Sequence, residues 1–208
     1  MSSLPVATSQ IEPSSGVVKG LGDPAGAEIG FAECDDPRCL IEEQLPSPSE
    51  FDGGLQKGLS RSYTDNGDGT ITDNRTGLTW EKLSDDGSIH DWDNTYSWAT
   101  AFSGKVATLN STSFAGHADW RLPNVNELQS LIDYGTVNPA VSSAFNSGCA
   151  PGCTVTTCSC TRSASYWPST SSQSSPTLAW TVFFGSGLVG NSTKSTSTFF
   201  ARAVRGGS

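Results

Sequence analysis

Six cysteines are the residues of this chain whose types and spacing most directly imply chemistry. They fall into a local pair and a cluster of four: Cys34 and Cys39, then Cys149, Cys153, Cys158 and Cys160. The last two are too close to favour bonding each other, so we expect bridges that join Cys149 and Cys153 to them, in either connectivity. A four-thiolate zinc site is the alternative, although the spacings do not match paired Cys-x-x-Cys knuckles. Disulfides indicate an oxidising compartment, and we expect a secreted, extracellular or cell-surface protein.

A loop rich in glycine and aspartate, residues 64–75, offers oxygen atoms to a cation. In the register of an EF-hand loop, Thr64 would take the first ligand place and Arg75 the last, where carboxylates belong. A turn between two strands explains the glycines better. We expect no cofactor, although a calcium site of another kind is left open, with these candidate ligands: Asp65, Asp68 or Asp73. A second acidic cluster also offers carboxylates, or is simply a solvated loop: Asp85, Asp86, Asp91 and Asp93.

Motifs typical of catalysis are not found in the sequence. The two histidines, His90 and His117, have no partner at helical metal spacing, and there is no Ser-His-Asp motif, phosphate loop or zinc motif. We therefore expect a protein that is not an enzyme.

Charge is distributed unevenly along the chain, whose formal net charge is −9. Residues 134–208 contain no Asp or Glu, yet they carry four basic side chains: Arg162, Lys194, Arg202 and Arg205. The acidity of the whole chain argues against a nucleic-acid partner, while the basic C-terminal third could attract an anionic ligand. The alternative is that these cations offset acids that lie nearby in space.

Two of the six tryptophans, Trp92 and Trp167, lie in polar loops, whereas the others lie in expected helices or strands. Exposed aromatic rings stack on sugar faces in carbohydrate sites, so both are ligand-binding candidates together with Arg162 and Lys194. A loop tryptophan can also fold over the core, and for Trp167 this alternative is the stronger one.

These candidate residues must be positioned by a mixture of strands and helices. We expect a hairpin over 63–80, helices over 96–109 and 124–134, a long loop over 161–177, and strands over 178–184, 187–189 and 199–204. Asp93 or Asn94 is expected to cap the first helix. This order of elements is typical of an α+β domain.

The run from Gly116 to Leu131 combines a strand end, a turn and a helix start. Pro123 ends the strand, and Asn124 with Glu127 three residues later has the pattern of a capping box. Arg121 and Glu127 are expected to join the strand to the helix through an ion pair.

The same run, GHADWRLPNVNELQSL, is similar to the central motif of the Lcl C-terminal domain family, also called DUF1566. Further segments resemble motifs of that family, and the resemblance covers about residues 60 to 205: 64–82, 166–170, 179–184 and 201–205. It implies a C-type-lectin-like domain of antiparallel sheets, two helices and long loops, distantly related to formylglycine-generating enzymes. Members of the family occur at bacterial surfaces, and the Lcl type is implicated in adhesion to sulfated glycans and in trimer formation.

Two parts are expected along the chain, an acidic N-terminal arm or linker over residues 1–50 and the Lcl-type domain over residues 51–208. The arm has few large apolar groups and cannot form a core alone. No segment is apolar enough to span a membrane, and the first residues lack the pattern of a signal peptide, so we expect no membrane insertion.

The resemblance and the cationic C-terminal third together predict a secreted or cell-surface bacterial binding or adhesion module, with an anionic glycan as its ligand. The alternative is a structural subunit of an extracellular filament or polymer, whose N-terminal arm packs on a neighbouring subunit. In either case we expect a homo-oligomer, a trimer or a filament, with no nucleic-acid partner.

Overall fold

The computed structural model describes residues 60–206. The chain divides into two units, Met1–Lys57 and Gly58–Ser208, and every described element belongs to the second. The predicted N-terminal arm, its boundary at residue 50 and the Cys34–Cys39 pair lie outside the described residues.

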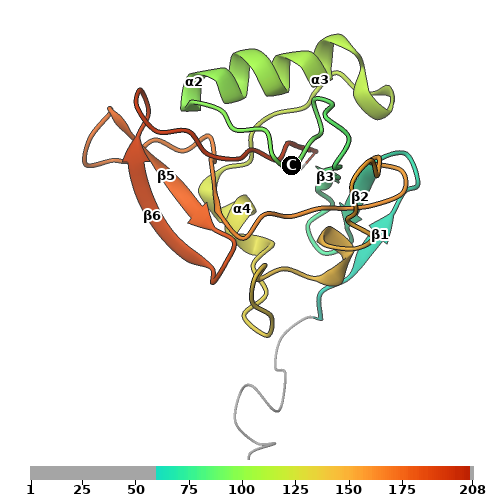
Figure 1. Ribbon diagram of the computed structural model, residues 1–208. Helices are drawn as coiled ribbons and strands as arrows, with labels where there is room; N and C mark the ends of the chain where they lie inside the picture. Colours follow the sequence, from blue (N-terminus) through green and yellow to red (C-terminus); the bar gives the residue numbers. More distant parts are fainter. Residues whose placement is uncertain (1–59, 207–208) are drawn as a thin grey trace, which may run out of the picture. The chain divides into compact units, whose positions relative to one another are not determined.

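Two small antiparallel sheets form the strand part of the domain (Figure 1). In the order in which they pair, the strands of the first sheet are β1 (Tyr63–Asp65), β2 (Thr70–Asp73), β3 (Thr79–Glu81) and β7 (Val204–Arg205). Those of the second sheet are β4 (Ser165–Tyr166), β5 (Leu178–Phe183) and β6 (Leu188–Thr193). Because β7 pairs with β3, the first sheet joins the beginning of the domain to its end.

One long helical segment and one short helix accompany the sheets. α2 (Trp98–Thr100) continues through a π-helical segment (Ala101–Val106) into α3 (Ala107–Ser111), and this segment runs across the top of the view in Figure 1. α4 (Val125–Ser130) lies between the two sheets in the same view. With two antiparallel sheets and two helices, the domain has the predicted α+β class.

The hairpin between β1 and β2 turns at residues 66–69, as its turn chemistry predicts. Asp68 Oδ1 accepts hydrogen bonds from both the backbone N–H and the hydroxyl of Thr70, at 3.1 and 2.6 Å. Gly69 has a φ of +94°, and an added Cβ would lie 2.7 Å from Cγ2 of Val155. Only glycine fits this position without a shift of its neighbours.

The long helical segment begins later than its predicted cap. Ser97 is the N-cap, and its Oγ accepts from the backbone N–H of Thr100 at 3.2 Å. Asn94 instead closes the preceding loop, where its side chain donates to Ser88 O at 2.7 Å. The prediction of Asp93 or Asn94 as the cap was wrong because Asp and Asn favour loop turns as strongly as helix caps.

α4 begins as predicted. Asn124 Oδ1 accepts from the backbone N–H of Glu127 at 2.9 Å, and Glu127 Oε2 accepts from that of Asn124 at 2.7 Å, which completes the capping box. The expected ion pair is also present, with Arg121 Nη2 at 2.7 Å from Glu127 Oε1. The helix ends at Ser130 rather than near residue 134, because Ile132 leaves it to pair with Val141.

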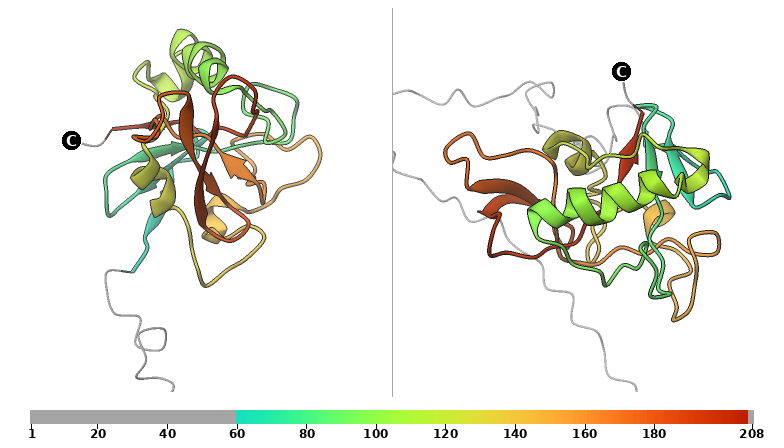
Figure 2. Two further views of the ribbon diagram at one scale, coloured as in Figure 1. Left: turned by 90° about the vertical axis from the view of Figure 1, so that its left-hand side faces the viewer. Right: turned by 90° about the horizontal axis from the view of Figure 1, so that it is seen from above.

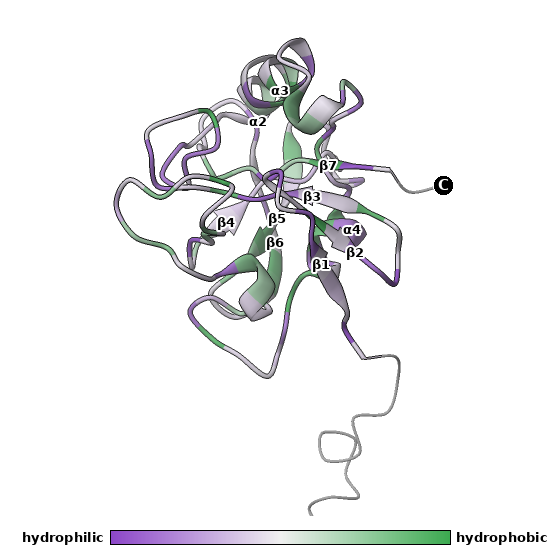
Figure 3. Cartoon of the chain, turned by 90° about the vertical axis from the view of Figure 1, so that its right-hand side faces the viewer, coloured by the Kyte–Doolittle hydropathy of each residue, from purple (hydrophilic) through white to green (hydrophobic). Residues whose placement is uncertain are grey.

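The main hydrophobic core collects side chains from both sheets and from α4. Its members include Ile71, Trp80, Leu128, Phe145, Tyr166, Val182 and Val204. Figure 3 shows hydrophobic residues along β5 and α4. Two smaller buried clusters contain residues of the long helical segment, Ala101 and Val106 in one and Leu109 in the other. None of the helices in residues 60–206 has the length and apolarity that a membrane crossing requires.

Candidate ligand-binding site

Two disulfides hold the cystine loop, which we define as residues 149–160. Cys149 bonds to Cys160, and Cys153 bonds to Cys158. Both bridges follow the sequence prediction, and the structure decides between the two connectivities that it left open. Because each of these sulfurs is bonded to another sulfur, none remains as a thiolate for zinc.

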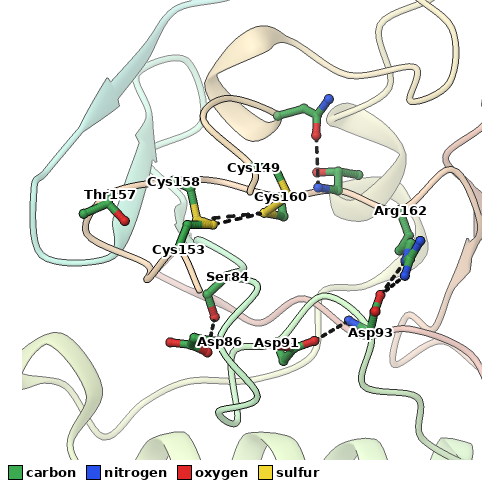
Figure 4. The surroundings of a disulfide bond; sticks show 12 residues. Ser84, Asp86, Asp91, Asp93, Cys149, Cys153, Thr157, Cys158, Cys160 and Arg162 are labelled. Atoms are coloured by element: carbon green, nitrogen blue, oxygen red, sulfur yellow. Dashed lines mark hydrogen bonds and ion pairs between the residues drawn. A yellow bond between two sulfur atoms is a disulfide. The ribbon is translucent and has the colours of Figure 1, made fainter. Parts of the chain in front are cut away.

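A second loop, the acidic loop of residues 84–94, packs against the cystine loop (Figure 4). The backbone N–H of Asp85 donates to Cys153 O at 3.0 Å, and Asp85 O accepts from the N–H of Gly152 at 2.6 Å. Figure 4 shows Asp93 of this loop turned toward Arg162, which follows the cystine loop in sequence.

A hollow of about 420 Å³ opens beside these loops, and we call it the Trp92 hollow. Its lining is mostly polar: Trp92, Asn138, Pro139, Asn146, Cys149, Thr161, Arg162 and Ser163. The Arg162 guanidinium carbon lies 4.1 Å from the centroid of the Trp92 ring, a cation–π arrangement. The structure therefore brings together two of the four ligand-binding candidates that the sequence suggested.

Arg162 is also paired with the carboxylate of Asp93. Its Nε donates to Asp93 Oδ1 at 2.6 Å, and its Nη2 contacts the same oxygen. The two side chains are 40 % and 51 % exposed. An ion pair this open to water contributes only about 0–1 kcal/mol to stability. The guanidinium can therefore exchange Asp93 for another acceptor at little cost.

The acidic loop gathers three carboxylates, as the sequence suggested, but it does so without Asp86. Ligand oxygens of Asp85, Asp91 and Asp93 lie within 4.8 Å of one another, an arrangement that hard cations such as calcium accept. Asp91 already accepts from the backbone N–H groups of Gly87 and Asp93, at 2.6 and 2.8 Å. Its carboxylate therefore has a structural role within the loop.

Asp86 is engaged elsewhere, by donors on both sides of it. Its Oδ1 accepts from the hydroxyl of Ser84 at 2.8 Å and from the N–H of Ser88 at 3.0 Å. Burial would raise the pKa of Asp86, but its hydrogen bonds outweigh burial and lower the pKa.

A buried ionic network fixes the acidic loop to the rest of the domain. Glu81 of β3 is fully buried, and its Oε1 lies 2.5 Å from Lys105 Nζ and 2.7 Å from His90 Nδ1. Lys105 also donates to Ile89 O at 2.5 Å. Burial alone would raise the pKa of Glu81, but the charge of Lys105 and the hydrogen bond from His90 outweigh burial and lower the pKa. Glu81 is thus ionised at neutral pH.

Arg202 fixes the cystine loop in the same way. It is 1 % exposed and donates to three oxygens: Glu81 O at 2.9 Å, Cys160 O at 2.6 Å and Thr161 Oγ1 at 2.8 Å. Two of the three chain segments that line the Trp92 hollow are therefore held by charged side chains inside the domain. Because these segments are already fixed, binding a ligand there costs less ordering of the loops.

Trp167 does not belong to the ligand-binding residues, and the stronger of its two alternatives, a loop tryptophan that folds over the core, is confirmed. The residue is 0 % exposed. Its Nε1 donates to Tyr96 O at 2.9 Å, and its ring packs edge-on against Phe199 with the centroids 4.8 Å apart. No face of the ring is free to stack on a sugar, because the loop that carries Trp167 folds over the core.

Lys194 lies away from the lining of the Trp92 hollow, so the C-terminal cations do not form one surface. Its Nζ lies 4.1 Å from the Trp98 ring centroid and donates to Ser171 Oγ at 2.6 Å. Of the other C-terminal cations, Arg202 is buried, and Arg205 pairs with Asp119 at 2.8 Å. Much of the basic C-terminal third is therefore buried or offset by nearby acids.

The aspartates of the first hairpin do not converge on a shared cation. Asp65 Oδ2 pairs with Lys82 Nζ at 2.7 Å, and Asp68 bonds to Thr70 of its own turn. Asp73 accepts from the N–H of Arg75 at 2.9 Å. Within residues 60–206, neither group of close potential metal ligands includes any of the three aspartates. The three aspartates that the sequence offered as calcium candidates, Asp65, Asp68 and Asp73, are therefore not gathered into one set of ligands.

Sequence reasoning missed several residues of the hollows. Asn138, Pro139 and Asn146 line the Trp92 hollow from loops without any recognisable motif. A second hollow, of about 410 Å³, includes Arg61 and Arg75 in its lining. Only the folding of distant loops brings these residues together, so no local pattern could have indicated them.

The fold and the Trp92 hollow define a disulfide-stabilised α+β domain with long loops and a polar surface hollow beside an aromatic ring. The chain belongs to the Lcl C-terminal domain family, whose model matches residues 69–205. This match confirms the resemblance of the sequence motifs to that family. No curated protein is similar enough to this chain to count as a match.

Proposed function

We propose that this domain is a C-type-lectin-like binding or adhesion module outside the cell, which binds an acidic glycan in the Trp92 hollow. The observation that carries the proposal is the guanidinium of Arg162, 4.1 Å from the Trp92 ring at the wall of the hollow. An aromatic ring beside a few fixed polar groups is the chemistry of carbohydrate sites, because the ring packs on C–H groups while polar groups bind hydroxyls.

The polar groups of the hollow suit sugar hydroxyls. Asn138 and Asn146 are exposed, and a side-chain amide offers both donors and an acceptor to neighbouring hydroxyls. Pro139 and Trp92 supply the apolar part of the lining. The hollow is rigid on one side, since the Cys149–Cys160 disulfide forms part of its frame.

Arg162 is the group that favours an acidic ligand over a neutral one. A sulfate or carboxylate presents the same oxygens to a guanidinium that Asp93 presents now, and can bind them in a fork. Since the Arg162–Asp93 pair is about half exposed, a ligand can displace Asp93 without opening the core. Asp93 then acts as an internal competitor for the ligand.

A location outside the cell is supported by the two disulfides of the cystine loop. Such bonds persist in oxidising environments and are rare in the cytosol.

The test is the affinity of the full chain for a sulfated glycan, with heparin as the probe, measured by calorimetry at two salt concentrations. Arg162→Gln should weaken binding about tenfold or more, because a hydrogen bond to a charged group contributes about 1.5–3 kcal/mol. Asp93→Asn should strengthen binding, because it frees the guanidinium and removes one negative charge from the rim. The two variants at one contact are thus expected to act in opposite directions.

Lys194→Gln is the matched control, since it removes one positive charge outside the lining of the hollow. If Arg162→Gln and Lys194→Gln weaken binding equally, the glycan is attracted by net charge alone and the site is wrong. A parent protein that fails to bind even at low salt overturns the acidic-glycan proposal, because screening is weakest there.

A further inference from the structure

The outer edge of β6 is an open strand edge. β6 is the last strand of the second sheet, and it lies at the periphery of the domain in Figure 1, on the side that faces the viewer in the left panel of Figure 2. Its first four residues, Leu188 to Asn191, are exposed. The strand pairs with β5 on one side, and no other strand of residues 60–206 pairs with it.

The register shows which backbone groups point outward. Trp180 of β5 donates its N–H to Thr170 O, at 3.0 Å, on the side away from β6. Its partner Asn191 therefore belongs to a non-hydrogen-bonded pair, and so does Val189, two positions along. The N–H and C=O groups of Val189 and Asn191 thus face away from β5, and no backbone group of the described part bonds to them.

Exposed apolar side chains adjoin this edge. In the described part of the chain, four large apolar residues are exposed to solvent, with these exposed fractions: Tyr134 69 %, Val137 71 %, Leu188 69 % and Val189 36 %. The loop that carries the first two lies on the turn that leads into β6. Tyr134 Oη donates to Gly187 O at 3.4 Å, and Asn138 N–H donates to Gly185 O at 3.3 Å.

The edge also lacks the features that usually protect one. Charged side chains, proline or a bulge normally keep an exposed strand from pairing with another chain. β6 reads Leu-Val-Gly-Asn-Ser-Thr, without a charge or a proline. The outer strand β1 of the first sheet does have such protection. It is only three residues long and carries Asp65, which is paired with Lys82.

We propose that β6 is a self-association surface, on which two copies of this chain pair their β6 strands antiparallel about a twofold axis. If the outward N–H and C=O groups of Val189 and Asn191 form the bonds, Val189 lies opposite Asn191 of the partner subunit, and Asn191 lies opposite the partner's Val189. Gly190 then lies opposite Gly190 of the partner subunit. This pairing joins the two three-stranded sheets into one continuous sheet and covers the exposed apolar side chains at both ends.

The net charge of the domain is compatible with a second copy of the chain pairing at this edge. Residues 60–206 contain nine Lys or Arg and eleven Asp or Glu, so they carry only −2 of the formal net charge of −9, and the domain itself adds little repulsion between two copies. In the proposed register the nearest charged side chain of the edge, Lys194, would lie across from Ser186 of the partner subunit. No like charges meet along the shared edge.

The first test is the mass of the full chain by sedimentation velocity over a concentration series up to about 100 µM, where a dimer with a Kd of about 10 µM is mostly formed. Asn191→Pro removes an outward N–H without removing a bond to β5, so it should weaken dimerisation about tenfold or more. Leu188→Lys should act likewise, by placing a charge in the apolar patch. Asn191→Ala keeps the N–H and should dimerise like the parent.

The second test fixes the register. In a non-hydrogen-bonded antiparallel pair the Cα atoms are about 4.5 Å apart, within disulfide range. Gly190→Cys should therefore form a disulfide-linked dimer on oxidation, and it has room for a side chain, because an added Cβ would approach Thr181 Oγ1 only to 3.6 Å. Ser192→Cys should not, since its opposite residue is Leu188 of the partner subunit.

Each outcome decides for or against the β6 pairing. A parent that stays monomeric at every concentration overturns it, as does an oligomer that Asn191→Pro and Leu188→Lys leave intact while circular dichroism shows both variants folded. Failure of the Gly190→Cys crosslink in a parent that dimerises overturns the register. Loss of the dimer in the edge variants together with the crosslink supports the proposal, whatever the glycan assays show.

Discussion

At the residue scale, Glu81 connects parts of the chain that are far apart in sequence. One carboxylate oxygen meets Lys105 of the helical segment and His90 of the acidic loop, and the other accepts from the backbone N–H of Ala203 at 3.0 Å. Arg202 donates to the backbone oxygen of Glu81. Buried charges of this kind are costly unless every partner stays in place.

We predict that Glu81→Gln lowers the free energy of unfolding by about 3–5 kcal/mol, because it leaves the buried ammonium of Lys105 without a counter-charge. Chemical denaturation measures it. In the double variant Glu81→Gln with Lys105→Met, the buried positive charge is gone, so the loss should be smaller than the sum of the two single losses. Strict additivity of the two substitutions would contradict this account.

The pKa of Glu81 gives a prediction of its own for acid conditions. The carboxyl has a pKa below its ordinary value of 4.5 in the folded domain, so the unfolded chain binds the proton more tightly. This stabilisation is complete above pH about 4.5 and is lost as pH falls through the lowered folded pKa. Unfolding free energies measured between pH 7 and acid should therefore fall more steeply in the parent than in Glu81→Gln. Parallel curves would show that other carboxyls dominate.

At the element scale, local patterns predicted what local contacts determine. The capping box of Asn124 and Glu127 and the turn at residues 66–69 involve residues within three or four positions of each other, so composition and spacing were sufficient. The cystine loop follows the same logic, because its bridges span sequence separations of 11 and 5.

Contacts between distant elements could not be predicted in this way. Lys105 lies in a helical segment, where a single lysine usually marks the solvent-facing side, yet here it is 1 % exposed. The Trp92 hollow combines loops from three parts of the chain, and only Trp92 and Arg162 among its residues had a type that drew attention. Trp167 had the same type and polar setting, but it is buried.

The two disulfides should differ in their effect on binding. Replacing Cys149 and Cys160 by alanine breaks the disulfide with a sequence separation of 11 and should lower the free energy of unfolding by about 3 kcal/mol. Replacing Cys153 and Cys158 breaks the disulfide with a separation of 5 and should lower it by about 2 kcal/mol. Cys149 lines the Trp92 hollow, so only the first pair should also weaken heparin binding under conditions where both variants are folded. Equal loss of affinity in the two variants would argue against the hollow as the site.

At the scale of the whole molecule, the end of the domain is a structural part of its beginning. β7 pairs with β3, Arg121 and Val204 form a bridge, and the backbone N–H of Glu81 donates to Ala203 O at 3.0 Å. Such long-range pairing means that the first sheet is incomplete until the last residues are in place.

Removal of the last segment should therefore affect the whole domain rather than one edge. We predict that a chain ending at Thr198 no longer unfolds cooperatively on heating, because β7 and Arg202 are both lost. Near-ultraviolet circular dichroism, recorded with the disulfides intact, measures the transition. A chain ending at Gly206 keeps every described contact and should unfold like the parent. Arg202→Met separates the two causes, since it retains β7 but leaves the oxygens of Glu81 and Cys160 without their donor. If the chain ending at Thr198 unfolds with the same sharp transition as the parent, the C-terminal segment is an accessory and not a part of the core.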